Sequence, residues 1–252
     1  MANFYDTHFH LDLQDSKDKI LKYIELNNIY TIAVTNLPPL YEKLDKEIQS
    51  KYIRIALGFH PELINQYKKY IPDMWRLLPN AKYIGEVGID LKANKESKNL
   101  QVSFFENLIE QCGNIGNKIL SVHSRMAASE VVSIIGSNFN GKVILHWYSG
   151  TKKNQIQAIS NGYYFSVNYA MLCSDSGKKI VANIPNDRIL IETDSPFIKI
   201  DNQVFNPLNI KKIIEGISKI KGENVDDMQN ILWNNFLNLI SNEDSFVKST
   251  HS

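Results

Sequence analysis

The sequence predicts an α/β fold built as a single (β/α)8 barrel, the TIM barrel. Short segments rich in β-branched and aromatic residues alternate with amphipathic segments along the whole chain. The short segments are apolar on both faces, which is typical of buried parallel strands. A chain of 252 residues is a common length for one such barrel. An open doubly wound sheet is the alternative, but eight strands without a glycine-rich fingerprint favour the barrel.

The boundaries of the expected elements follow from where each pattern begins and ends. We expect strands over residues 4–8, 30–35, 53–58, 83–87, 119–122, 143–146, 163–167 and 189–193. We expect helices over residues 16–27, 40–50, 99–115, 127–137, 152–161, 174–183, 206–220 and 225–240. Residues 1–244 would then form one barrel domain, and residues 245–252 a flexible C-terminal tail.

Composition narrows the classes of protein that remain. The 28 Lys and Arg residues nearly cancel the 27 Asp and Glu residues, so no overall positive field would draw the protein onto nucleic acid. Two cysteines are too few for a disulfide framework. No apolar run reaches the length of a membrane span, and the N-terminus lacks a signal pattern. We therefore expect a cytoplasmic protein.

Five of the six histidines lie where a predicted strand runs out into a loop. In a barrel the carboxyl ends of all strands open onto one face, which is where catalytic groups lie. Two carboxylates share this position. The residues at this position are His8, His10, His60, Glu86, His123, His146 and Asp194. Imidazole and carboxylate are ligands for zinc, manganese and magnesium, so the sequence predicts a metal site among them.

The first and last strands of a barrel are neighbours, which brings three of these residues together. His8 and His10 are two positions apart and would face the same side of their strand. Asp194 could complete their site or accept a proton from metal-bound water, although Asp is also a common first residue of a turn. We expect Asp6 to support the histidine pair rather than to bind metal.

Glu86 lies inside an apolar strand, where a carboxylate is costly unless it is paired or bound to metal. Its two oxygens could bridge two cations, with His123 and His146 holding the second one. Each of these histidines could instead be a hydrogen-bonded structural residue. The flanking glycines would allow a close approach or simply relieve crowding.

Three residues are candidates for substrate contact. His60 could donate a hydrogen bond to a phosphate oxygen, or it could be a rim residue fixed by the turn at Pro61. We favour substrate contact over metal ligation, because the other residues already fill two metal sites. Arg125 could clamp a phosphate, or it could be a surface residue at a helix start. Trp147 could stack on a base, or it could pack its loop against the barrel.

Six short motifs, in chain order, resemble those of the TatD family of metal-dependent deoxyribonucleases. Each is weak alone, but the ordered set spans the first strand to the last. They are DTHFH (6–10), GFHP (58–61), GEVGID (85–90), HSR (123–125), HWYSG (146–150) and ETDSP (192–196).

This resemblance implies a TIM barrel with up to two divalent ions, Mg²⁺, Mn²⁺ or Zn²⁺, that acts as a DNA 3′-end exonuclease or a related phosphodiesterase. His8, His10 and Asp194 would hold one ion, His123 and His146 the other, and Glu86 would bridge them. The segment after residue 196 departs from the family, which usually has an arginine-rich stretch there, whereas Lys199 is the only base here. The chain thus looks like a diverged branch, such as the TatD-like nucleases of Qat-type antiphage cassettes, with possible protein partners in such a cassette.

The leading hypothesis is hydrolysis of a DNA phosphodiester by metal-activated water, with Asp194 as the proton acceptor and single-stranded DNA ends as the substrate. We expect a monomer or small oligomer without membrane contact. A hydrolase of small esters or amides is the second hypothesis. Its relatives often bridge their metals with a carbamylated lysine, but the fourth strand here holds Glu86 and no lysine. The third is a subunit of a defence complex that binds nucleic-acid ends without cutting.

Overall fold

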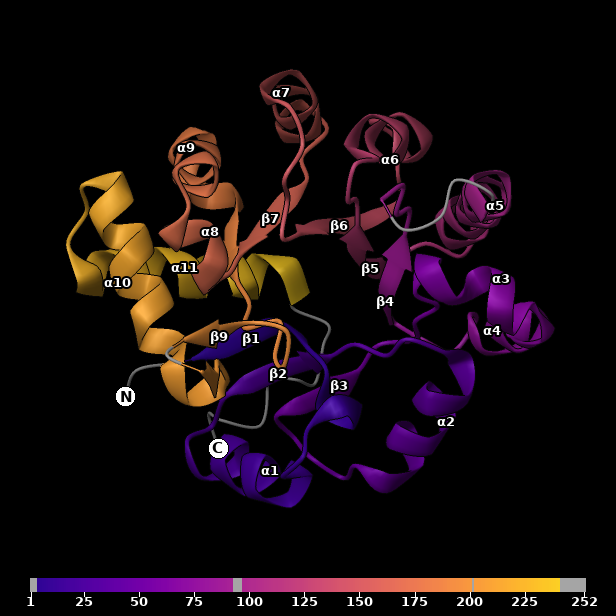
Figure 1. The fold of residues 1–252 in the computed structure, drawn as a ribbon, viewed down its shortest axis with the longest axis horizontal. Helices are drawn as coiled ribbons and strands as arrows, with labels where there is room; N and C mark the ends of the chain where they lie inside the picture. Colours follow the sequence, from indigo (N-terminus) through magenta and orange to yellow (C-terminus); the bar gives the residue numbers. More distant parts are fainter. Residues whose placement is uncertain (1–3, 93–96, 201, 241–252) are drawn as a thin grey trace.

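A computed structural model describes residues 4–92, 97–200 and 202–240. The described residues contain eight parallel strands that alternate with helices, as the sequence predicts (Figure 1). The strands are β1 (Tyr5–Phe9), β2 (Tyr30–Ala33), β3 (Ile53–Ile55), β4 (Tyr83–Gly88), β5 (Lys118–His123), β6 (Gly141–His146), β7 (Tyr164–Val167) and β8 (Ile189–Ile191). The expected tail, residues 245–252, lies outside the described residues.

The strands close into a ring. Strands β1 to β3 form one parallel sheet and β4 to β8 form another. Leu57, just after β3, joins the sheets at one seam, because its N–H donates to the Tyr83 carbonyl at 2.9 Å. At the other seam the Asp194 N–H donates to the His8 carbonyl at 2.9 Å. The α/β class is therefore confirmed, and the hydrogen bonds at both seams agree with the predicted (β/α)8 barrel.

Helices surround the strands (Figure 1). Their buried apolar residues belong to the same core as those of the strands. They are α1 (Lys17–Leu26), α2 (Pro38–Glu47), α3 (Ile64–Tyr67), α4 (Ile71–Leu77), α5 (Lys98–Ile115), α6 (Ala128–Ile135), α7 (Lys152–Ser160), α8 (Tyr169–Cys173), α9 (Asp175–Asn183), α10 (Ile210–Lys221) and α11 (Val225–Ile240).

Several short elements differ from the sequence prediction. Helices α3, α4 and α8 were not expected, because four to seven residues are too few to show helical periodicity. The helix expected over 206–220 begins only at Ile210, since Pro207–Asn209 forms a 3-10 turn whose first N–H groups are capped by Asn206. The loop after β8 also contains an unpredicted antiparallel pair, β9 (Lys199–Ile200) and β10 (Gln203–Val204).

Helix α11 packs against the amino-terminal ends of the strands. The Phe236 ring stacks on Tyr5 at the start of β1, with the ring centroids 4.4 Å apart. The Asn235 side chain donates to the Ile189 carbonyl at the start of β8, at 2.8 Å. With this end covered, the carboxyl-terminal end of the barrel is left for the loops that carry the predicted site. In the described part of the chain, no helix combines the length and apolar character that crossing a membrane requires.

Candidate metal centre

The predicted metal ligands meet at the carboxyl-terminal end of the barrel, around a cavity of about 610 Å³. They arrive from five strands or the residues just after them, although the sequence separates them by up to 186 positions (from His8 to Asp194). His8, His10, Glu86, His146 and Asp194 are each 5% exposed or less. Five such residues could not remain together in a dry site without an interaction that compensates their lost hydration.

Four ligand atoms converge at one side of this centre. The His8 Nε2 lies 3.3 Å from the His10 Nε2 and 3.5 Å from the Glu86 Oε2. The Asp194 Oδ1 lies 3.6 Å from the His8 Nε2 and 3.5 Å from the His10 Nε2. Four ligands held 2.0–2.1 Å from a tetrahedral ion lie about 3.3–3.4 Å from one another. His8, His10 and Asp194 therefore fit three ligands of one divalent cation, and the Glu86 Oε2 lies at a similar distance from both histidines.

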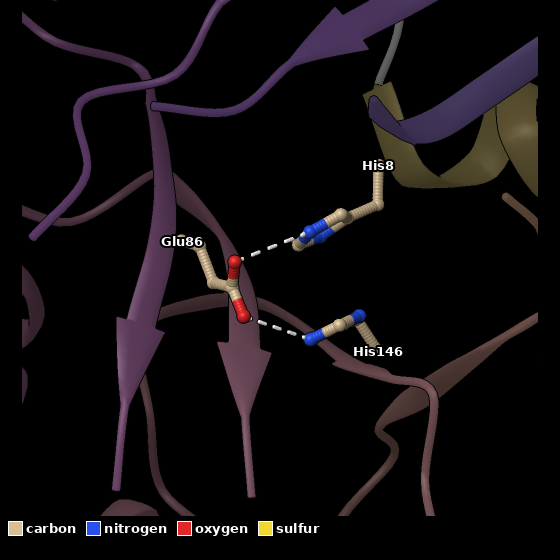
Figure 2. Close-up of side chains that lie close together, drawn as sticks. All are labelled: His8, Glu86 and His146. Atoms are coloured by element: carbon tan, nitrogen blue, oxygen red, sulfur yellow. Dashed lines mark hydrogen bonds and ion pairs between the residues drawn. The ribbon is translucent and has the colours of Figure 1, made fainter. Parts of the chain in front are cut away.

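The other carboxylate oxygen of Glu86 faces a second group of ligand atoms. Its Oε1 lies 2.7 Å from the His123 Nδ1 and 3.0 Å from the His146 Nε2. Figure 2 shows Glu86 between His8 and His146, with a different oxygen directed at each imidazole. This is the placement that a bridging carboxylate requires.

His60 lies closer to the second group than expected. Its Nε2 is 3.4 Å from the Glu86 Oε1, and His60, Glu86 and His123 form one of the candidate sets of metal ligands. The prediction that His60 contacts phosphate rather than metal stays a prediction.

The charges of the centre also suit a cation. Burial and the nearby His146 lower the pKa of His8 to about 4, so its imidazole is neutral at pH 7 and can act as a ligand. Burial disfavours protonation of His10, yet Asp194 and Glu86 outweigh it and raise its pKa to about 9. Burial disfavours the charged form of Glu86 too, but His60 and His146 hold its pKa well below the usual range. The carboxylates thus draw positive charge to this point, which a divalent ion would supply.

Residues behind the ligands fix their orientation, and the sequence did not single them out. The Ser121 hydroxyl pairs with the His8 Nδ1 at 2.7 Å, and the Asp90 Oδ2 pairs with the His123 Nε2 at 2.7 Å. Glu192 lies 3.6 Å from the His146 Nδ1. A carboxylate or hydroxyl on the outer nitrogen orients a ligating imidazole and raises its basicity. Asp90 and Glu192 belong to the motifs GEVGID (85–90) and ETDSP (192–196). No sequence pattern marks Ser121, because its contact with His8 depends on how β1 and β5 lie in the barrel.

Asp6 supports His8, as expected, by accepting hydrogen bonds from backbone N–H groups rather than by contacting the imidazole. Its Oδ1 accepts hydrogen bonds from the His8 N–H at 3.1 Å and the Thr193 N–H at 3.0 Å. Burial raises the pKa of this carboxyl to about 7. Asp6 therefore ties β1 to the chain after β8 and keeps His8 and Asp194 in register.

Two glycines allow strands to approach closely beside Glu86. A Cβ on Gly58 would lie 1.6 Å from the Thr35 carbonyl oxygen, and one on Gly88 would lie 2.0 Å from the His123 carbonyl oxygen. Gly88 also has a φ of +140°, which disfavours any other residue. For Gly88, one of the glycines that flank Glu86, the structure therefore supports a close backbone approach rather than mere relief of crowding.

Arg125 and Trp147, the other two candidates for substrate contact, line the cavity. Among the described residues, neither forms a hydrogen bond or an ion pair with a predicted metal ligand. Arg125 is exposed in the loop after β5, and Trp147 is 37% exposed directly after His146. Phe197, which the sequence analysis did not select, lines the cavity as well and is 57% exposed. Its ring meets the His10 ring edge-on, with the centroids 5.0 Å apart.

A TIM barrel with this arrangement of histidines and carboxylates at the carboxyl ends of its strands defines a metal-dependent hydrolase. Residues 5–241 match the family described as TatD related DNase, so the chain belongs to the TatD family. The resemblance seen in the motifs is confirmed.

Similar proteins agree with this assignment. The chain is 26% identical over 244 residues to an uncharacterized metal-dependent hydrolase of Methanocaldococcus jannaschii, covering 93% of the chain and 95% of that protein. It is 28% identical over 256 residues to a human protein named deoxyribonuclease TATDN3, covering 93% of each. Its fold resembles that of the TatD homologue YjjV of Escherichia coli, with a TM-score of 0.83, 18% identity, and coverage of 94% of this chain and 98% of that one.

Proposed function

We propose that this hydrolase cleaves phosphodiester bonds of DNA at the 3′ ends of single strands, with two divalent ions bound on either side of Glu86. The observation that carries the proposal is the pair of ligand groups on opposite oxygens of one buried carboxylate. Two ions about 3.5–4 Å apart are typical of enzymes that hydrolyse phosphate esters. The name of the human relative, a deoxyribonuclease, supports the choice of DNA.

The ligand sets follow from the distances. His8, His10, Asp194 and one oxygen of Glu86 would hold the first ion, and His123, His146 and the other oxygen would hold the second. Ions at these positions would lower the pKa of a bound water toward about 7 and stabilise charge on the phosphate. The spacing of the first set suits Zn²⁺ or Mn²⁺, whereas Mg²⁺ prefers an octahedral, oxygen-rich site.

The protein side chains supply the rest of the reaction. Asp194 borders the cavity, its Oδ1 faces His8 and His10, and its other carboxylate oxygen would accept the proton of the attacking water. As the water oxygen bonds to phosphorus, the bond from phosphorus to the leaving sugar oxygen breaks, and that oxygen takes up a proton from solvent. Arg125 and His60 also border the cavity and can donate hydrogen bonds to the non-bridging phosphate oxygens.

The proposal is tested with purified protein stripped of metal and then supplied with Mg²⁺, Mn²⁺ or Zn²⁺. Single- and double-stranded oligonucleotides of DNA and RNA, labelled at either end, report the substrate and the direction of digestion. We expect Glu86→Ala and Asp194→Asn to reduce turnover at least about 1,000-fold while the folded structure persists, because each removes a predicted ligand. Asp187→Asn, on an exposed carboxylate, is the matched control. Undiminished turnover in both site variants would refute the assignment.

The second candidate is hydrolysis of small phosphate esters, and the size of the cavity favours it. A volume of about 610 Å³ suits a small molecule. Inclusion of mononucleotide esters, aryl phosphates and lactones in the same assay separates the two candidates, since each predicts a different best substrate.

A further inference from the structure

Two aromatic side chains at the mouth of the metal cavity are exposed where a substrate would enter. Trp147 follows β6 and Phe197 follows β8, so their loops lie on either side of β7 along the rim. Both line the cavity, with 37% and 57% of their surfaces exposed. Large aromatic surfaces are normally buried, and exposure inside a binding cavity indicates contact with a ligand.

The backbone holds Trp147 in an uncommon conformation. Its φ of +38° lies in the left-handed region, which is unfavourable for a bulky residue. Its N–H donates to the Glu192 Oε1 at 3.1 Å. Glu192 is fully buried, and its carboxylate also accepts hydrogen bonds from Ser166 and Asn168. This network fixes the start of the loop and so limits where the indole can lie. Strained residues that are held this firmly cluster at functional sites.

Phe197 is anchored next to the metal ligands. Its N–H donates to the Asp194 carbonyl at 2.9 Å, and one edge of its ring meets the ring of His10. More than half of its surface is exposed, and it lines the cavity. A planar group bound to this ring would therefore lie beside the first ligand set.

Charge around the cavity does not favour a long phosphate backbone. Among the described residues that line it, Arg125 is the only Arg or Lys, whereas Glu62, Glu86, Asp90 and Asp194 are carboxylates. In the sequence from residue 195 to residue 210, Lys199 is the only basic residue. Two divalent ions and one arginine can bind one or two phosphates, but the described residues that line the cavity offer no further cation for additional phosphates.

We propose that Trp147 and Phe197 form a recognition site for the nucleobase of the terminal nucleotide. The enzyme would then select an unpaired strand end by stacking on its base rather than by binding a long stretch of backbone. Every base has a π-face, so this recognition would tolerate all four bases. The inference rests on the proposed cleavage of nucleic acid and adds which part of the substrate is recognised.

The test compares two single-stranded oligonucleotides of equal length and charge. One ends in a normal 3′ nucleotide, and the other ends in a tetrahydrofuran abasic nucleotide. We expect the wild-type protein to have a kcat/KM about 5- to 140-fold higher for the first, which corresponds to about 1–3 kcal/mol per stacked base. Phe197→Ala should lower kcat/KM for the normal end and leave the abasic end unchanged, so that the preference falls toward one.

Matched variants separate stacking from loss of structure. Phe197→Tyr keeps the ring and should retain the preference. Leu208→Ala removes an apolar side chain that is similarly exposed, at 51%, but does not line the cavity, and it should change nothing. Trp147→Ala should act like Phe197→Ala, and unchanged metal content would show that His146 is still in place.

Salt dependence provides an independent measurement. Contact with a single phosphate predicts about a threefold fall in kcat/KM between 50 and 200 mM salt, whereas six contacts predict a fall of about 300-fold. A steep salt dependence, or equal cleavage of normal and abasic ends by the wild-type protein, would overturn the inference and leave the nuclease assignment standing. If neither oligonucleotide is cut with any metal, the proposed function itself fails, and the inference fails with it.

Discussion

The contact between Asp90 and His123 offers a test of whether the two ligand groups are separate. The Asp90 Oδ2 lies 2.7 Å from the His123 Nε2, and the His123 Nδ1 points at the Glu86 Oε1 from 2.7 Å. Asp90 is fully buried and holds no other predicted ligand through a described hydrogen bond. Substitution of Asp90 by Asn keeps the shape of the side chain and removes its negative charge. The imidazole of His123 then becomes a weaker and less firmly oriented ligand.

Loss of such a partner costs about 10- to 100-fold in metal affinity, or about 1.4–2.8 kcal/mol. We expect Asp90→Asn to weaken only the second ion, because His8, His10 and Asp194 do not contact Asp90. Calorimetric titration of the metal-stripped protein measures both binding steps. Asp73→Asn, which alters a half-buried carboxylate paired with Arg76 outside the cavity, is the control. Equal weakening of both steps, or no change in either, would refute the division into two ligand groups.

Two further predictions concern stability. Gly88→Ala places a Cβ 2.0 Å from the His123 carbonyl oxygen at a φ of +140°, so we expect a loss of at least about 2 kcal/mol and a fall in Tm of about 4–8 °C. Gly113→Ala, in α5 with no atom within 4 Å of the added carbon, should instead stabilise the fold slightly, and an equal effect of both would contradict the steric argument. Phe236→Ala removes a fully buried ring that stacks on Tyr5, so we expect it to cost about 3–5 kcal/mol in chemical denaturation. Metal affinity should not change, because α11 packs at the opposite end of the barrel.

The barrel could be predicted from the sequence because its strands are long enough to show a pattern and their alternation with helices is regular. Helices α3 and α4 were not predicted because each is too short to show a helical periodicity. In addition, Pro72 in the first turn of α4 is also common in loops. The pairing of β9 with β10 involves two residues from each strand. Such short pairing depends on the tertiary setting of the loop and leaves no local signal.

The metal ligands could be predicted because barrel topology places every strand end on one rim, whatever its position in the sequence. The residues behind them could not. Ser121 reaches His8 only because the barrel brings β1 and β5 within hydrogen-bonding distance, and this is a property of the closed barrel. Phe197 was overlooked because an aromatic residue after a turn reads as ordinary packing, and only its exposure beside His10 shows otherwise.

The number of metal ions bound per chain tests the central claim most directly. Metal-stripped protein is reloaded with Zn²⁺ or Mn²⁺ and freed of excess ion. Inductively coupled plasma mass spectrometry then gives the metal concentration, which is divided by the protein concentration. The geometry around Glu86 predicts two ions per chain in the wild type and a reduced content in Glu86→Gln, which removes the charge shared by both ligand groups. One ion per chain in the wild type, or two ions retained by Glu86→Gln with unchanged affinity, would contradict the bridging role of Glu86.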